Sequence, residues 1–196
     1  TVVPYLQRIE KMLSGMLVRK PVRLDDVSDL VREQLFDVDL EGNDLNIWLY
    51  QTARIVISFG HCGVLVDAPK EGEKARPYWV TYKPSDILGW RTEIIDGARV
   101  LTQVRLLEKV VEPDGAYGEK NITQVRVLER GRYEIHRKDD KKGEYKLFEE
   151  GEMSLKDKIP FSVAYSNRVG FYESRSPLYD IAELNLKHYQ IQSDLD

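Results

Sequence analysis

The chain is poor in the residues that form disulfides and metal sites. Cys62 is its one cysteine, which excludes an internal disulfide and indicates no extracellular disulfide framework. Its three histidines, His61, His136 and His188, fall in different parts of the chain and show neither HxH nor HExxH spacing. Because a zinc site needs ligands grouped at such spacings, we expect neither a metal nor another cofactor.

Long apolar runs are also lacking. No run approaches the roughly 20 residues that a membrane-spanning helix requires, so we expect no membrane partner. The formal net charge is −4, which gives the chain no general attraction for nucleic-acid phosphates. The content of 42% hydrophobic and 32% charged residues is typical of a soluble globular protein, and 196 residues fit one domain.

Helical spacing of apolar residues dominates the first part of the chain. The first helix should end near Lys20, because Pro21 disfavours helix in the residue before it. A second, weaker helix is expected over about residues 25–36. A third begins at a cap on Asn43 and ends at Gly60. The apolar positions of the first helix are Leu6, Ile9, Met12, Leu13, Met16 and Leu17.

After the third helix the pattern changes to that of strands. Residues 64–66 and 78–82 are expected as strands, and residues 84–86 as a turn of about one helical turn. Residues 99–150 have the pattern of a β-meander, whose last hairpin has a charged tip at residues 137–144.

One octapeptide occurs twice in the meander, as TQVRLLEK at Thr102–Lys109 and as TQVRVLER at Thr123–Arg130. Each copy alternates apolar residues with an arginine, Arg105 or Arg126, as strands with one solvent-exposed face do. We therefore expect the copies to be neighbouring antiparallel strands with both arginines on the solvent face.

These elements predict an α+β fold: N-terminal helices, then an antiparallel-rich β-meander, then a long C-terminal helix. Trp79, Trp90 and Phe161 lie in the expected strands and should contribute to the core. Aromatic residues near Lys83 are also compatible with base stacking, but basic residues are sparse among them, which favours core packing.

The segment SFGHCG (Ser58–Gly63) has the composition of a phosphate-binding loop but not its order. Phosphate loops run from a strand into a helix, whereas here a helix runs into a strand, so we interpret the segment as a helix-ending turn. His61 and Cys62 are adjacent and should point to opposite faces of that strand, which leaves no nucleophile–base pair. Cys62 is expected to be buried.

No carboxylate pair is placed for acid–base catalysis, and we predict no catalytic residue. An enzyme such as a nuclease or hydrolase with a weakly marked site stays an alternative. It would need His61, Asp67 and Asp86 to converge on one cleft, and we expect these groups to lie apart.

The last helix opens at Ser176–Pro177 and has apolar residues on two faces. One face carries Leu178, Ile181, Ala182 and Tyr189. The other carries Leu184, His188, Ile191 and Leu195. Either the helix only closes the core, or the first face packs on this domain and the second on a neighbouring subunit or on a segment missing from this sequence. The candidates for subunit packing are Leu178, Ile181, Leu184, Tyr189, Ile191 and Leu195.

The same helix reaches Asp196 without the Gly, Asn or Pro that commonly ends a helix, and Thr1 is not an initiator methionine. We therefore expect a piece of a longer protein in which this helix continues.

Four blocks of the chain stand out together. They are LVRKP (Leu17–Pro21), SFGHCGVLVD (Ser58–Asp67), RPYWVTYKPSDILGWR (Arg76–Arg91) and the segment from IPFSVAYSN to the last residue (Ile159–Asp196). In this order they resemble a family of portal proteins from tailed bacteriophages and prophages. The last block also resembles a wider portal pattern, in which an Ile-Pro strand and an Asn loop precede a helix that begins with Ser/Pro-Leu.

The resemblance implies a structural, non-enzymatic part of a portal, the ring at one capsid vertex through which double-stranded DNA is packaged and ejected. Residues 1–175 would be the wing domain, and residues 176–196 the start of a stem helix. The implied partners are other copies in a usually dodecameric ring, the packaging terminase, head–tail adaptor proteins, and DNA that passes without tight binding. The implied location is the virion, with the host cytoplasm during assembly. Another phage head or adaptor interaction module is the remaining alternative.

Overall fold

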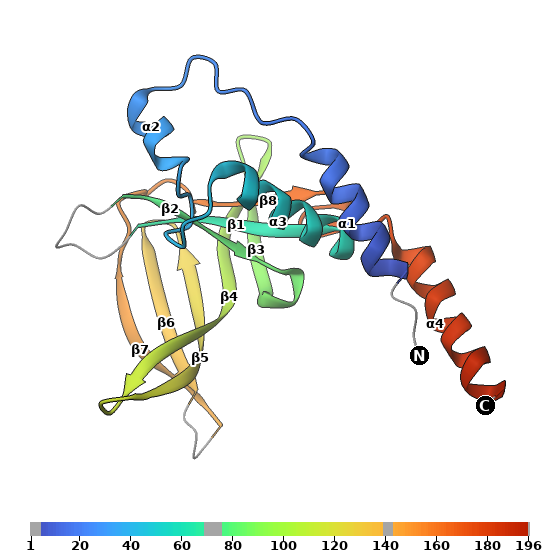
Figure 1. Ribbon diagram of the computed structural model, residues 1–196. Helices are drawn as coiled ribbons and strands as arrows, with labels where there is room; N and C mark the ends of the chain where they lie inside the picture. The colour runs from blue at the N-terminus through green and yellow to red at the C-terminus, as the bar shows by residue number, and fades with distance from the viewer. Residues whose placement is uncertain (1–4, 69–75, 139–142, 196) are drawn as a thin grey trace. The chain divides into compact units, whose positions relative to one another are not determined.

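The computed structural model describes residues 5–68, 76–138 and 143–195. It has a mixed α+β fold in which helices come first, antiparallel strands follow and a helix is last, as the sequence predicts (Figure 1). The helices are α1 (Tyr5–Leu17), α2 (Asp29–Gln34), α3 (Leu45–Phe59) and α4 (Tyr179–Leu195).

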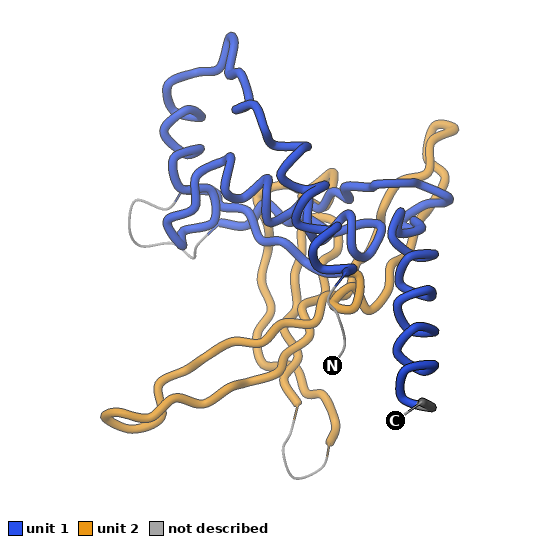
Figure 2. The backbone as a smooth tube through the Cα atoms, turned by 45° about the vertical axis from the view of Figure 1, so that its right-hand side comes forward, with its two compact units in different colours: residues 1–83, 161–196 blue, residues 84–160 orange. Residues whose placement is uncertain are grey.

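The chain divides into two compact units (Figure 2). Unit 1 comprises residues 1–83 and 161–196, and unit 2 comprises residues 84–160. Unit 2 is therefore an insertion in the chain of unit 1, a division that the sequence does not signal. The expected boundary between residues 175 and 176 does not separate the two units, because α4 belongs to unit 1.

Unit 1 contains all four of these helices and a three-stranded antiparallel sheet in the order β2-β1-β8. Its strands are β1 (His61–Asp67), β2 (Tyr78–Tyr82) and β8 (Phe161–Tyr165). A second, two-stranded hairpin consists of β9 (Arg168–Gly170) and β10 (Glu173–Ser174).

The starts of α2 and α3 differ from the sequence expectation. The Asp44 carboxylate caps α3 by accepting hydrogen bonds from the backbone N–H groups of Asn46 and Ile47, both at 2.9 Å. Asn43, the expected cap, instead donates from Nδ2 to Asp39 at 2.8 Å. α2 is shorter than expected because it begins only after its cap at Ser28.

The core of unit 1 lies between α3 and the sheet. The rings of Trp48 and Trp79 meet edge to face, with centroids 4.7 Å apart, in a cluster that also buries Val38 and Leu45. Phe161 is buried as expected, whereas Trp79 is half-buried.

Unit 2 is the predicted meander. A short 3₁₀ turn, η1 (Pro84–Asp86), leads into a five-stranded antiparallel sheet in consecutive order. Its strands are β3 (Ile87–Ile95), β4 (Ala98–Asp114), β5 (Gly118–Glu129), β6 (Arg132–Lys138) and β7 (Tyr145–Glu152). Part of the expected charged tip, residues 139–142, lies outside the described residues. Trp90 is half-buried and pairs with the fully buried Val104.

The two octapeptide copies are neighbouring antiparallel strands, as predicted, but the expectation for Arg126 is wrong. In the β4–β5 register Leu106 lies opposite Arg126, and opposite residues share a face. Arg126 thus lies on the face of the buried Leu106, where Glu108 pairs with it at 2.8 Å. In this register an even-numbered residue of β4 always lies opposite an even-numbered residue of β5. The two copies of the octapeptide are 21 residues apart, so each even-numbered position of one copy corresponds to an odd-numbered position of the other. Equivalent positions of the repeat therefore face opposite sides of the sheet.

The buried side of α1 differs from the one that its apolar pattern predicts, because it carries a carboxylate and not the two methionines. Glu10 and Ser14 are buried, while Met12 and Met16 are exposed. Glu10 accepts hydrogen bonds from Arg54 of α3 at 2.6 Å from Nε and 3.4 Å from Nη2. The bond to Glu10 raises the pKa of Arg54, so the ion pair joins α1 to α3 over the whole physiological pH range.

Glu10→Gln should lower the free energy of unfolding by about 1–2 kcal/mol, because it leaves the Arg54 guanidinium without a charged partner at a half-exposed site. Urea denaturation followed by circular dichroism measures the change. Glu152→Gln is the matched control, since its ion pair with Lys156 is exposed on both sides and should have no measurable effect. Equal effects of the two substitutions would contradict a structural role for the Glu10 pair.

Candidate functional site

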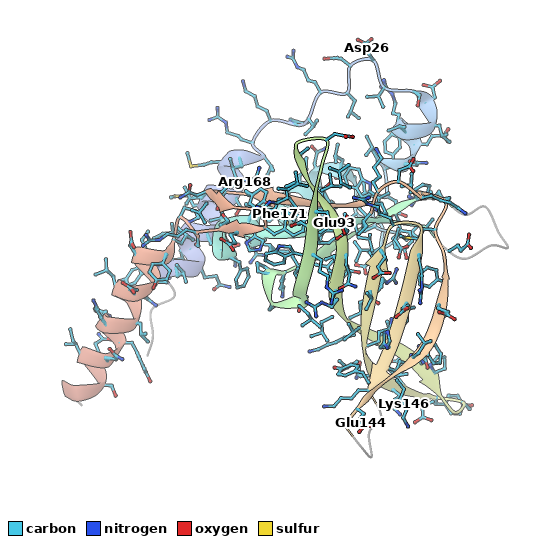
Figure 3. The ribbon with its side chains drawn as sticks, turned by 180° about the vertical axis from the view of Figure 1, so that it is seen from behind. Asp26, Glu93, Glu144, Lys146, Arg168 and Phe171 are labelled. Carbon is cyan, nitrogen blue, oxygen red and sulfur yellow. The ribbon has the colours of Figure 1, made fainter. Side chains whose placement is uncertain are left out.

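The C-terminal end of α3 is held to the segment that leads into α4. The Gly60 carbonyl oxygen accepts a hydrogen bond from the Ser166 backbone N–H at 2.8 Å, and the hydroxyl oxygens of Ser166 and Ser174 lie 2.9 and 2.7 Å from it. Ser174 belongs to the β9–β10 hairpin, which Arg168 and Phe171 mark in Figure 3. We call this group of contacts the Gly60 junction.

Ser176 extends the Gly60 junction to the first turn of α4. Its hydroxyl donates to the Ile57 carbonyl oxygen at 2.9 Å and accepts from the Leu178 backbone N–H at 3.0 Å. One side chain thus satisfies a free carbonyl at the end of α3 and a free N–H at the start of α4. The helix itself begins at Tyr179, so Ser176, the expected cap, lies in the turn before it and bonds the residue that precedes the helix.

Gly60 is required by the geometry of the junction. Its φ of +94° is in the region that favours glycine, and it ends α3, as the sequence predicts for this turn. A Cβ atom at this position would lie 3.0 Å from the backbone carbon of Arg175 and 3.0 Å from the backbone nitrogen of Ser176. The α4 segment therefore approaches α3 as closely as a glycine allows.

Gly60→Ala should destabilise the protein more than Gly42→Ala. Gly42 has a similar φ of +85° but has no atom within 4 Å of the added Cβ. Its substitution costs only the conformational strain of about 1–2 kcal/mol, whereas Gly60→Ala adds about 1–3 kcal/mol of overpacking against backbone atoms. Guanidinium denaturation of both variants separates the two contributions. Equal losses would show that the close approach does not constrain the fold.

The first turns of α4 pack on unit 1 beside α1 (Figure 1). Leu178 is buried, and Ile181, Ala182 and Asn185 are half-buried. These residues follow helical spacing along one side. Of the residues expected on that face, Leu178 and Ile181 are thus at least partly covered within this chain, whereas the side chain of Tyr189 is 46% exposed.

The second face of α4 is uncovered. Leu184, His188 and Ile191 lie on one side of the helix and are all exposed, with Leu184 at 65%. We call these three residues the α4 stripe. The side chain of Leu195, expected on the same face, lies outside the described residues. Leu186 is similarly exposed at 58% but lies on the opposite side of the helix from Leu184.

A groove of about 300 Å³ runs along α3 within unit 1, and we call it the α3 groove. The end of α1 and the loop after it supply one wall and β8 contributes to another. Apolar residues of the lining include Leu17, Leu49, Val56 and Ala164. Sequence reasoning missed this groove because its walls come from segments far apart in the chain.

Cys62 and His61 have the separate environments that the sequence predicts. Cys62 is fully buried, and burial raises the pKa of its thiol to about 11, so the thiol is protonated at neutral pH. His61 lies beside Tyr165, with ring centroids 6.2 Å apart, and burial lowers the pKa of its imidazole. Neither group has the environment of an activated nucleophile.

His61 and Asp67 do not come together. They are the first and last residues of β1, which places them roughly 20 Å apart along an extended strand. The Asp67 carboxylate instead accepts a hydrogen bond from the Tyr78 hydroxyl at 3.2 Å. Asp86 belongs to the other unit. Over residues 5–68, 76–138 and 143–195, no group of three His, Cys, Asp or Glu residues is placed to hold a metal ion.

Within the same ranges, no helix has the length and apolar character needed to cross a membrane. No model of a known protein family matches the chain, and no curated protein is significantly similar to it. The α4 stripe and the α3 groove are two apolar surface features of unit 1 that are available for binding a partner.

Proposed function

We propose that the chain is a structural part of a phage or prophage portal subunit: its wing region, with α4 as the start of a stem helix. The resemblance of four blocks spread over nearly the whole chain supports this proposal. The structural observation that carries it is α4, which is anchored tightly at its base and presents an uncovered apolar stripe.

Such a helix is suited to contact between subunits. The Gly60 junction fixes the direction of α4, so the entropy lost when a partner binds the helix is small. Residues spaced by three and four along a helix are the usual anchors of helix packing against a groove or another helix. The α4 stripe has this spacing, with Leu184, His188 and Ile191 as the anchors.

The proposed partners follow from the place of a portal in the virion. They are other copies of the subunit in a ring, dodecameric by resemblance, together with the packaging terminase and the head–tail adaptor proteins. Double-stranded DNA passes through the ring during packaging and ejection. A channel of this kind has to let DNA slide, and the net charge of −4 suits weak rather than tight contact with phosphates.

The proposal is tested by imaging the product of the complete reading frame that contains this chain. Negative-stain electron microscopy of that purified product should show closed rings with a central channel. Monomers, dimers or open filaments at all protein concentrations would contradict the portal assignment. They would favour another head or adaptor interaction module.

DNA binding by the chain itself should be negligible at physiological salt, because its net charge of −4 gives it no general attraction for DNA phosphates. A filter-binding assay with double-stranded DNA measures the affinity, and a basic DNA-binding domain of similar size serves as the positive control. A submicromolar dissociation constant would contradict a role in which DNA slides past the subunit.

A further inference from the structure

The α3 groove has the dimensions of a binding site for a helix. The α3 residues that line it are Asn46, Leu49, Thr52, Ala53 and Val56. All but Thr52 recur at intervals of three and four, so they form one line along α3, roughly 15 Å long at 1.5 Å per residue. On the same scale the α4 stripe, from Leu184 to Ile191, is roughly 10 Å long and fits within the groove.

A buried polar group in the groove lacks a partner. Thr52 is only 7% exposed, and its hydroxyl makes no hydrogen bond to any residue that the structure describes. An unsatisfied buried hydroxyl is unfavourable in an apolar site. The Thr52 oxygen itself has almost no accessible surface, so the hydroxyl does not open into the groove and the surface offered to a partner is largely apolar.

The two surfaces also have complementary charge. Residues 17–23, which contain the four lining residues from the end of α1 and the loop after it, include three basic residues and no acidic one. Lys20 itself lines the groove. Residues 180–194 of α4 include three acidic residues and one lysine, although Asp180 is already paired with Arg175 at 3.0 Å. Opposite charge favours α4 as the occupant and discourages contact between two identical grooves.

We propose that the α3 groove of one copy receives the α4 stripe of a second copy. Within one copy the stripe does not line the groove, and α4 extends from its base beside α1 away from the C-terminal end of that helix (Figure 1). Each copy therefore offers one surface and receives the other. When the two surfaces meet different neighbours, the contact is head-to-tail and closes into a ring or continues as a chain. This inference rests on the proposed function, because it names the surface that receives the stem-type helix.

Cross-linking tests the contact directly. The double variant Ala53→Cys, Ile191→Cys places one thiol in the groove and one on the stripe, while native Cys62 is buried and protonated. A bis-maleimide linker should convert it into a ladder of covalent oligomers longer than a dimer. Neither single variant should give a ladder. A second control is the double variant Tyr117→Cys, Ile191→Cys, in which the thiol on the exposed β4–β5 turn replaces the thiol in the groove. It should also give no ladder.

Matched substitutions test the energetics of the contact. Leu17→Asp in the groove and Leu184→Asp on the stripe should each weaken association roughly tenfold or more, as measured by sedimentation velocity. Leu30→Asp is the control for Leu17, because both leucines are 68% exposed but Leu30 lies on α2, outside the groove. Leu186→Asp is the control for Leu184 on the opposite side of α4. If neither Leu17→Asp nor Leu184→Asp changes the association constant, the inference is overturned.

Thr52→Val separates folding from association. Removing an unsatisfied buried hydroxyl should raise the Tm of the isolated chain. Association should be unchanged, because the hydroxyl does not open into the groove, and Thr52→Val is therefore the stability control for Leu17→Asp. A loss of association as large as that of Leu17→Asp would show that any change beside the groove weakens assembly and would count against the inference.

Cross-linking the complete gene product distinguishes the two proposals. Rings with a ladder support both. Rings without a ladder overturn the docking of α4 in the α3 groove and leave the portal assignment intact. A ladder without rings supports the docking and contradicts the portal assignment, and the absence of both overturns both.

Discussion

The direction of α4, and with it the apolar surface that the molecule presents, depends on one carbonyl group. The Gly60 oxygen is contacted by Ser166 and Ser174, which are 106 and 114 residues away in sequence. Ser176 adds a bond to Ile57 over 119 residues. These contacts close unit 1 around the inserted residues 84–160. Because loop-closure entropy grows only slowly with length, so long an insertion does not prevent a few well-placed bonds from fixing the last helix.

α1 illustrates why a helix can be predicted while its buried side cannot. Apolar residues at helical spacing correctly predicted a helix in this region, but the side turned inward is decided by Arg54, which is 44 residues away. Satisfying Glu10 with that guanidinium leaves Met12 and Met16 exposed. A buried carboxylate with a partner is stable, whereas one without is strongly unfavourable, so the ion pair overrides the preference of the methionines for the core.

The same limit applies to the sheet and to the candidate site. Local signals sufficed for the fold class and for the turn at Gly60. The face of Arg126 was mispredicted because strand register, which no single strand encodes, decides it. The insertion of unit 2 and the α3 groove were missed for a related reason. Both arise from segments that meet only after the chain has left unit 1 and returned to it.

The α4 stripe and the α3 groove belong to the same unit and are both incompletely satisfied by it. Apolar side chains of both surfaces remain in contact with water. Pairing stripe with stripe would cover one surface and leave the other in water, whereas contact between unlike surfaces covers both. Such contact forms a ring or a chain when the two surfaces of one copy meet different neighbours, and a two-fold dimer when they meet the same neighbour. The uncovered surfaces of the chain therefore favour pairing of the α4 stripe with the α3 groove over pairing of like surfaces.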